Sequence, residues 1–213
     1  MTARAAILAK IQKANDRSPT AEEAYLAWKE LPRSYCCVAG ADRESVILLL
    51  EGRLRDYEAT VARCCEKDAV NAVESILAGR SKRRILLPEG IPSSWLPMGI
   101  EFVVDRAFDA QALNRFEGVL TCASVAVAET GTVVLQNRAG QGRRAVTLVP
   151  DYHLCVVRMD EVVATVPEAI SRLQATSHLA TTFISGPSAT ADIEMTRIKG
   201  VHGPRVLDVL LME

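Results

Sequence analysis

The sequence lacks an excess of charge of either sign, and it lacks a long apolar run. Its 25 lysines and arginines against 26 aspartates and glutamates leave a net charge of −1. This balance gives no electrostatic reason to expect nucleic acid or an anionic membrane as a partner. Charge or proline interrupts the apolar stretches before they reach the length of a membrane span, and residues 1–4 lack the apolar core of a secretory signal. We therefore expect a cytoplasmic protein with no membrane span and no nucleic-acid partner.

Cysteine and histidine patterns typical of metal centres are also missing. The six cysteines include two adjacent pairs but no Cys-x-x-Cys and no run of iron–sulfur ligands. In a reducing compartment we expect them to stay free thiols that pack as small buried hydrophobic residues. The three histidines include no pair at i and i+4, so a zinc motif is absent. We expect this chain to hold no metal and no cofactor of its own.

The composition that remains is ordinary for a soluble globular protein. With 213 residues, 49% of them hydrophobic and 24% charged, the chain is long enough to bury a full core. Residues 3–14 carry apolar side chains at helical spacing, and the capping-box pattern from Thr20 to Glu23 starts a second helix that stops near Pro32. We predict an N-terminal helical extension over residues 1–40, which docks either on the body of the protein or on a partner.

From residue 42 onward, short apolar strands alternate with helical segments. The predicted strands are 60–64, 84–87, 99–104 and 206–211. The predicted helices lie around 46–50, 69–77, 110–116 and 167–176. Such alternation favours parallel strands joined by helical crossovers, whereas residues 119–157 show short strands separated by turns. We predict one α/β domain over residues 41–213, with a mostly parallel sheet and a β-rich insertion.

The most informative segment lies near the C-terminus, where turn residues interrupt two apolar runs. A strand is predicted at residues 181–184, and a Ser-Gly-Pro-Ser turn then leads into a short helix predicted at residues 190–198. A strand end, a turn and a helix start together expose backbone N–H groups, which suit a carboxylate or phosphate. A capped strand-to-helix turn is the simpler interpretation. The ligand-binding residues predicted here are Ser185, Gly186, Pro187, Ser188, Thr190, Asp192, Glu194 and Gly203. Two carboxylates among them argue against a highly charged ligand.

A second turn, Glu129-Thr130-Gly131-Thr132, lies between two apolar runs near the middle of the chain. One interpretation is a hairpin turn with a solvated Glu129 and a glycine at positive φ. The other places Glu129 in a pocket as general base or nucleophile, with Thr130, Gly131 and Thr132 binding an anion. We expect this turn and the one at residues 185–188 to form a single cleft for a small acid.

His202 is the second candidate catalytic residue, because it lies in a turn next to the predicted cleft. A histidine there can donate to a ligand carboxylate or accept a proton near neutral pH, although a surface histidine is the simpler interpretation. Asp192, Glu194 and His202 could together bind a divalent metal, but their spacing does not match a specific metal-binding motif.

The loop at residues 137–144 holds three arginines around two glycines. These arginines either clamp a phosphate or carboxylate or stay in solvent. The Gly-x-Gly of this loop is no dinucleotide fingerprint, because a strand rather than a helix follows it.

Several blocks of the sequence resemble the LUD (lactate-utilisation) domain family. They are residues 121–132, 148–153, 184–194 and 200–204, with a weaker match at residues 55–57. The resemblance covers most of the chain after its first forty residues. It implies a three-layer α/β/α fold similar to that of sugar-phosphate isomerases and CoA transferases. In open α/β sheets ligands bind beyond the carboxyl ends of the strands, so we expect the turn after the strand at 181–184 to lie at such an end.

The same resemblance also implies a function, which the fold alone would not indicate. It implies a subunit of a bacterial system that oxidises L-lactate to pyruvate, with a small anionic metabolite as ligand and iron–sulfur clusters on partner proteins. CoA transferases of similar fold use a glutamate near a comparable turn, which keeps open a stand-alone CoA-transferase-like or sugar-phosphate-type enzyme with Glu129 as catalyst. A non-catalytic scaffold is a third alternative, so whether the chain is itself an enzyme stays open.

Overall fold

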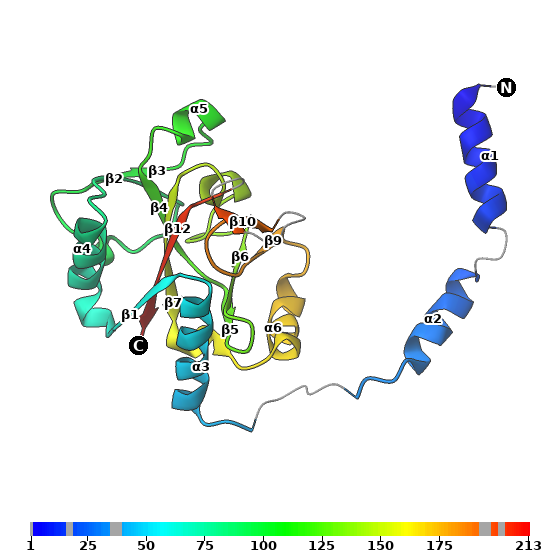
Figure 1. Ribbon diagram of the computed structural model, residues 1–213, viewed down its shortest axis with the longest axis horizontal. Helices are drawn as coiled ribbons and strands as arrows, with labels where there is room; N and C mark the ends of the chain where they lie inside the picture. Colours follow the sequence, from blue (N-terminus) through cyan, green and yellow to red (C-terminus); the bar gives the residue numbers. More distant parts are fainter. Residues whose placement is uncertain (1, 16–18, 35–39, 192–196, 200–202) are drawn as a thin grey trace. The chain divides into compact units, whose positions relative to one another are not determined.

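A computed structural model describes residues 2–15, 19–34, 40–191, 197–199 and 203–213 of the protein (Figure 1). The chain divides into two compact units, Met1–Tyr35 and Cys36–Glu213. The predicted boundary after residue 40 stays a prediction. No helix in the described ranges is long and apolar enough to cross a membrane.

The first unit contains two helices, as predicted. They are α1 (Ala3–Asn15) and α2 (Ala21–Glu30). The capping box forms as its sequence indicates: the Thr20 hydroxyl accepts the Glu23 N–H at 3.2 Å, and the Glu23 carboxylate accepts the Thr20 N–H at 2.7 Å. The rings of Tyr25 and Trp28 stack with their centroids 5.9 Å apart, and the Arg33 guanidinium lies 4.5 Å from the centroid of the Trp28 ring.

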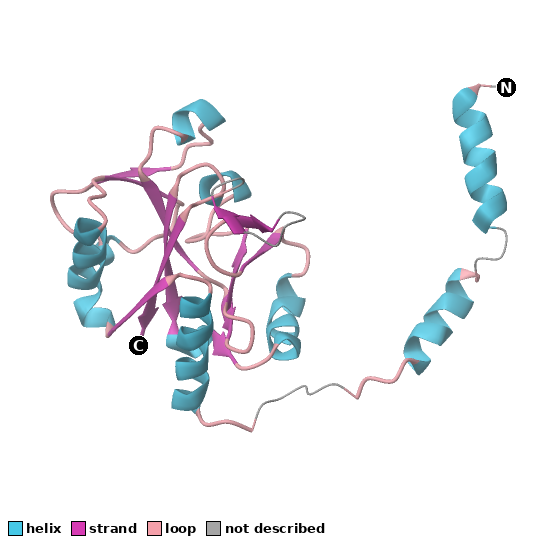
Figure 2. Ribbon diagram, in the orientation of Figure 1, coloured by secondary structure: helices cyan, strands magenta, loops and turns pink. Residues whose placement is uncertain are grey.

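Six parallel strands form the larger sheet of the second unit, which confirms the predicted fold class. Their order across the sheet is β1 (Thr60–Cys64), β12 (Val206–Met212), β7 (Tyr152–Arg158), β4 (Gly118–Cys122), β2 (Arg84–Leu87) and β3 (Glu101–Val104). The predicted strands at 60–64 and 84–87 coincide with β1 and β2. Strands lie at the centre of this unit and helices around them (Figure 2).

Both faces of the parallel sheet are covered, as its apolar strands require. One face packs against α4 (Ala69–Gly79) and η2 (Ser93–Trp95), with Leu77 among the fully buried side chains. The other face packs against α3 (Arg43–Asp56), where Leu50 and Leu54 are buried. The predicted helix at 110–116 is shorter in the structure, where α5 spans Ala110–Leu113.

A second, four-stranded sheet contains only part of the β-rich insertion predicted over residues 119–157, because β4 and β7 of that range belong to the parallel sheet. Its order is β8 (Val162–Val163), β5 (Val125–Val127), β6 (Thr132–Gln136) and β9 (Thr181–Ile184). Side chains from one face of this sheet join the core around α3, and those from its other face pack against α6 (Val166–Leu173). Short 3-10 turns complete the unit: η1 (Glu66–Asp68), η3 (Arg144–Thr147), η4 (Met159–Glu161) and η5 (Gln174–Thr176).

The helix predicted at residues 190–198 is wrong. Two short antiparallel strands, β10 (Ala189–Ala191) and β11 (Arg197–Lys199), occupy the described part of that segment. Thr190 therefore belongs to a strand, where it pairs with Ile198, and not to a helix start. β-Branched residues favour strands, and a run this short takes its structure from the segment that pairs with it.

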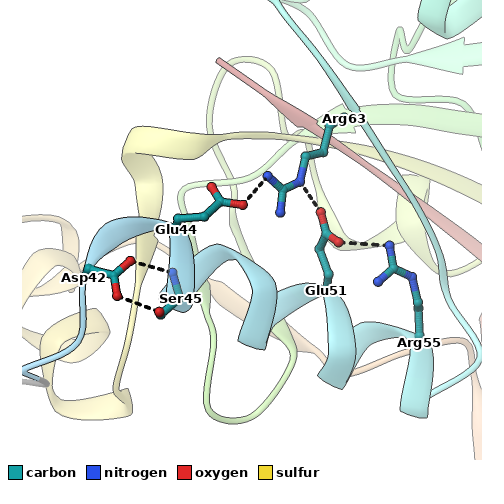
Figure 3. Close-up of polar contacts among 6 residues, drawn as sticks. All are labelled: Asp42, Glu44, Ser45, Glu51, Arg55 and Arg63. Carbon is teal, nitrogen blue, oxygen red and sulfur yellow. Dashed lines mark hydrogen bonds and ion pairs between the residues drawn. The ribbon is translucent and has the colours of Figure 1, made fainter.

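Polar contacts fix α3 at its start and against β1 (Figure 3). The Asp42 carboxylate accepts the Ser45 N–H at 2.9 Å and so caps the helix. Further along, the buried Glu51 carboxylate accepts hydrogen bonds from Arg55 and from Arg63 of β1. Burial raises the pKa of Glu51, but the hydrogen bonds from the two arginines outweigh that effect and hold it below its ordinary value. A charged glutamate thus joins the helix to the edge of the sheet.

Candidate functional site

A cavity of about 260 Å³ lies beside the turn that follows β9. Its walls are the end of β9 and the turn at residues 183–189, Arg144 and Thr147 of η3, His153 of β7, Leu207 of β12, and Pro204. Five of the residues predicted to bind a ligand line it or border it: Ser185, Gly186, Pro187, Ser188 and Gly203. The C-terminal turn therefore does border a cavity, as its sequence suggested.

The cavity lies at a different end of the sheet from the one that the sequence predicts. His153 and Leu207 are the second residues of β7 and β12, so the cavity lies at the amino-terminal ends of these parallel strands. Ser185 does follow the carboxyl end of a strand, but that strand is β9 of the smaller sheet, antiparallel to its neighbour β6. The rule for open parallel sheets fails here because the turn belongs to the other sheet.

The turn at residues 185–188 is held in place from two sides. Gly186 has a φ of +82°, and a Cβ added to it would lie 2.5 Å from the Cβ of Tyr57 at the end of α3. On the other side, the Ser188 N–H donates to the Pro204 carbonyl at 2.8 Å. The turn thus has a defined position over the cavity.

A chain of hydroxyl groups joins the two predicted turns. The Oγ1 atoms of Thr130 and Thr132 are 2.8 Å apart, and Thr132 Oγ1 is 2.8 Å from Ser185 Oγ. Gly131, at a φ of +59°, packs against Arg53 of α3. The structure therefore brings the two turns together, although they are more than fifty residues apart in sequence.

Glu129 lies on this hairpin but makes a different contact. Its side chain is exposed, and Oε1 accepts the N–H of Val166, the first residue of α6, at 2.7 Å. A carboxylate there compensates an unpaired amide and the positive end of the helix dipole. None of residues 129–132 is among the residues that line the cavity, so the lining includes the C-terminal turn but not this one. The catalytic role of Glu129 stays a prediction.

The arginines of the loop at 137–144 are separated in the structure and do not form one clamp. Arg143 pairs with the Asp105 carboxylate at 2.7 Å. Arg138 borders another cavity, shared with Arg143 and Asp105. Arg144 alone lines the cavity beside the C-terminal turn.

Arg144 supplies positive charge to the cavity. Its Nη1 donates to the carbonyl and the hydroxyl of Thr147, at 3.2 and 3.0 Å. Among the described residues, no carboxylate forms an ion pair with Arg144. Partial burial lowers the pKa of Arg144, because the guanidinium loses hydration without gaining a counter-ion. A small anion bound in the cavity would supply the missing counter-ion.

His153 forms part of the cavity floor. Its side chain is only 1% exposed, and Nε2 lies 2.8 Å from Thr121 Oγ1. Burial and the nearby charge of Arg144 lower the pKa of His153 to about 3, so the imidazole is neutral in the physiological range. The sequence contains one signal for it, the matching block at residues 148–153, but only the fold places His153 and Arg144 in the lining of one cavity.

The remaining predicted site residues cannot be placed in this cavity. Asp192, Glu194 and His202 lie outside the described residues. Thr190 is described only as a residue of β10. In the parts of the chain that are described, no three histidine, cysteine, aspartate or glutamate side chains are grouped so as to hold a metal ion.

Comparisons with known proteins agree on one family. Residues 47–212 match the family model of the LUD domain. Lactate utilization protein C of Deinococcus radiodurans is 40% identical over 181 residues, which are 84% of each chain. Lactate utilization protein C of Shouchella clausii is 40% identical over 90 residues, 40% of this chain and 39% of that protein. A crystal structure of a DUF162 family protein from Deinococcus radiodurans superposes with a TM-score of 0.72 at 36% identity, covering 81% of this chain and 99% of that one.

Proposed function

The chain belongs to the LUD domain family, and on that premise we propose that it serves bacterial lactate utilisation, as a cytoplasmic subunit of a system that oxidises L-lactate to pyruvate. The observation that carries this function is the 40% identity, over 84% of both chains, to a protein named lactate utilization protein C.

The chemistry of the cavity supports a small carboxylate as ligand. Arg144 offers a positive charge that no described carboxylate neutralises, and Thr147 and Ser188 lie beside it in the lining. The volume of about 260 Å³ is below the usual range of ligand pockets, about 300–1,000 Å³, which favours a ligand of few atoms. A three-carbon acid meets both requirements.

The redox chemistry indicates which protein of the system has which role. Conversion of lactate to pyruvate removes two electrons, and a redox carrier must accept them. We propose that iron–sulfur partner proteins hold this carrier and that this chain binds the acid. The alternative, a CoA-transferase-like or sugar-phosphate-type enzyme built on Glu129, gains no support from the contacts of Glu129, whose carboxylate caps α6.

Growth on L-lactate tests the proposed function. We expect deletion of the gene, in a host without another lactate oxidase, to abolish growth on L-lactate and to spare growth on pyruvate. The wild-type gene should restore growth and Arg144→Gln should not. Arg138→Gln is the matched control, because Arg138 belongs to the same loop but borders a different cavity, and it should restore growth fully.

Normal growth of the deletion strain on L-lactate would refute the proposed function. Co-purification from the native host, followed by iron analysis and a lactate-oxidation assay with and without this chain, tests the partner proteins directly. Iron recovered with this chain, together with activity that needs it, is the expected result.

A further inference from the structure

We propose that the chain carries a second ligand site, which takes a small zwitterion such as an α-amino acid. Arg138 binds the carboxylate of this ligand, and Glu89 binds its ammonium group. The site is the cavity that Arg138 borders together with Arg143 and Asp105, called the second cavity below. Its lining shares no residue with the cavity beside the C-terminal turn, so this site is independent of the proposed function.

The first support is the position of the second cavity at one end of the parallel sheet. Pro88 and Glu89 directly follow β2, and Asp105 directly follows β3. The Cys122 N–H, at the end of β4, donates to the Gly140 carbonyl at 2.7 Å, which ties the loop that borders the cavity to β4 as well. The second cavity therefore lies at the carboxyl ends of three neighbouring strands, unlike the cavity beside the C-terminal turn.

The order of these strands marks a topological switch point. β2 lies between β3 and β4 in the sheet. The chain passes from β2 to β3 on one side, whereas the chain that leaves β4 next joins the parallel sheet at β7, on the side away from β2. Connections thus leave the neighbouring strands β2 and β4 in opposite directions. In open α/β sheets, ligands bind outside the carboxyl ends of the strands at such a point.

The second support is that two segments in direct contact build the cavity. The Gly140 N–H donates to the Glu89 carbonyl at 2.7 Å. Gly142 has a φ of +73°, and a Cβ added to it would lie 2.9 Å from the Cβ of Pro88. The loop that carries Arg138 is thus held against the segment that follows β2. The lining is therefore formed by the fold itself.

The third support is the balance of charge in the lining. Arg143 donates to both carboxylate oxygens of Asp105, at 2.7 and 3.1 Å, so these two residues neutralise each other. The other two charged residues of the lining are Glu89 and Arg138, and both are exposed. Among the ion pairs of the described residues, none includes Glu89 or Arg138. One anion and one cation therefore line the same cavity without pairing with each other.

A zwitterion matches this lining better than a simple anion or a simple cation does. An anion on Arg138 would be repelled by Glu89, and a cation on Glu89 would be repelled by Arg138. A ligand with both groups pairs with both residues, and hydrogen bonds between charged groups are the stronger ones. Pro88 and Ala139 add apolar lining for a short side chain. The volume of about 320 Å³ is at the lower end of the usual range of ligand pockets, about 300–1,000 Å³, which favours a small amino acid.

Isothermal titration calorimetry on the full-length chain at pH 7.5 tests the proposal with L-alanine as the probe. We expect L-alanine to bind the wild-type chain. Displacement titrations then compare two analogues at the same site: propionate lacks the ammonium group of alanine, and ethylamine lacks its carboxylate. Each should bind at least about tenfold more weakly than L-alanine, because it loses one charged contact.

Four substitutions assign the binding to the second cavity. Glu89→Gln and Arg138→Gln each remove one charge from its lining, and each should weaken the binding of L-alanine at least about tenfold. Glu74→Gln and Arg115→Gln are the matched controls, because they remove the same charges from exposed residues outside the lining, and both should bind as the wild type does. All four side chains are exposed, so the urea midpoints should stay unchanged.

No binding of L-alanine by the wild-type chain would overturn the proposal, as would unchanged affinity in Glu89→Gln or in Arg138→Gln. Propionate that binds as tightly as L-alanine would indicate an anion site, and ethylamine that does so would indicate a cation site; either result contradicts a zwitterion. Growth on L-lactate is a separate measurement. Because the proposed acid binds in the other cavity, failure of the alanine titrations leaves the proposed function standing, and loss of that function leaves this site standing.

Discussion

At the scale of single residues, burial decides what the ionisable groups of the site do. Glu129 has the residue type of a catalyst, yet it is exposed and caps α6. His153 was not among the predicted catalytic residues, yet it lines the cavity with Arg144, is buried and stays neutral. The burial of His153 also makes the stability of the fold depend on pH.

We predict a loss of stability as the pH falls below 6.5. The pKa of His153 is about 3 in the folded protein and near 6.5 in the unfolded chain, so only the unfolded chain gains a proton in this range. The stabilisation is therefore complete above pH 6.5 and is lost as the pH falls, at up to about 1.4 kcal/mol per pH unit. Urea unfolding at pH 7.5, 6.5 and 5.5 measures it.

His153→Gln is the control for this pH dependence, because it removes the titrating group and keeps a polar contact with Thr121. Its loss of stability between pH 6.5 and 5.5 should be smaller than that of the wild type. Carboxylates with lowered pKa values, such as Glu51, lose their contribution only at more acidic pH. Equal losses in the two proteins would show that His153 is not the group responsible.

At the scale of elements, a glycine fixes the turn that borders the cavity. Gly186 has a positive φ, which disfavours other residues, and it packs so closely against Tyr57 that a side chain would clash. The element after the turn was predicted as a helix and is a strand pair, β10 with β11. Local spacing located the turn, but it did not identify the partner of the segment that follows.

We predict that Gly186→Ala destabilises the protein more than Gly99→Ala does. Both glycines have positive φ, +82° and +88°, so both substitutions carry the backbone strain of about 1–2 kcal/mol. Only Gly186 lacks room, since nothing lies within 4 Å of a Cβ at Gly99. Urea unfolding at pH 7.5 should show an extra loss of about 1 kcal/mol or more for Gly186→Ala. Equal losses would mean that Tyr57 moves aside freely.

At the scale of the whole molecule, two sheets and the ends of their strands build the site together. β7 and β12 of the parallel sheet contribute His153 and Leu207, and β9 of the smaller sheet carries the turn. The cavity forms where the amino-terminal ends of β7 and β12 lie beside the carboxyl end of β9. The core of this unit is built from its own residues, with Val46 and Met212 as its outermost members in sequence.

We predict that a chain beginning at residue 41 unfolds at the same urea concentration as the second unit of the full-length chain. It keeps every residue of the core clusters and the N-cap of α3. A chain beginning at residue 46 is the matched control. It loses Asp42 and the Arg43 hydrogen bond to Val162, and should be less stable by about 1 kcal/mol or more. A lower urea midpoint for the chain from residue 41 would show that the preceding residues stabilise the second unit.

The sequence by itself determined the class of the fold, most strands of the parallel sheet, the capping box of α2 and the turn beside the cavity. These features depend on local periodicity, capping patterns and turn residues, which act over a few neighbouring positions. Only the tertiary structure decided that Arg144 and His153 line one cavity, that Thr132 contacts Ser185, and that Glu129 caps α6. Those contacts join distant segments, and a residue's burial and partners depend on the packing of the whole chain.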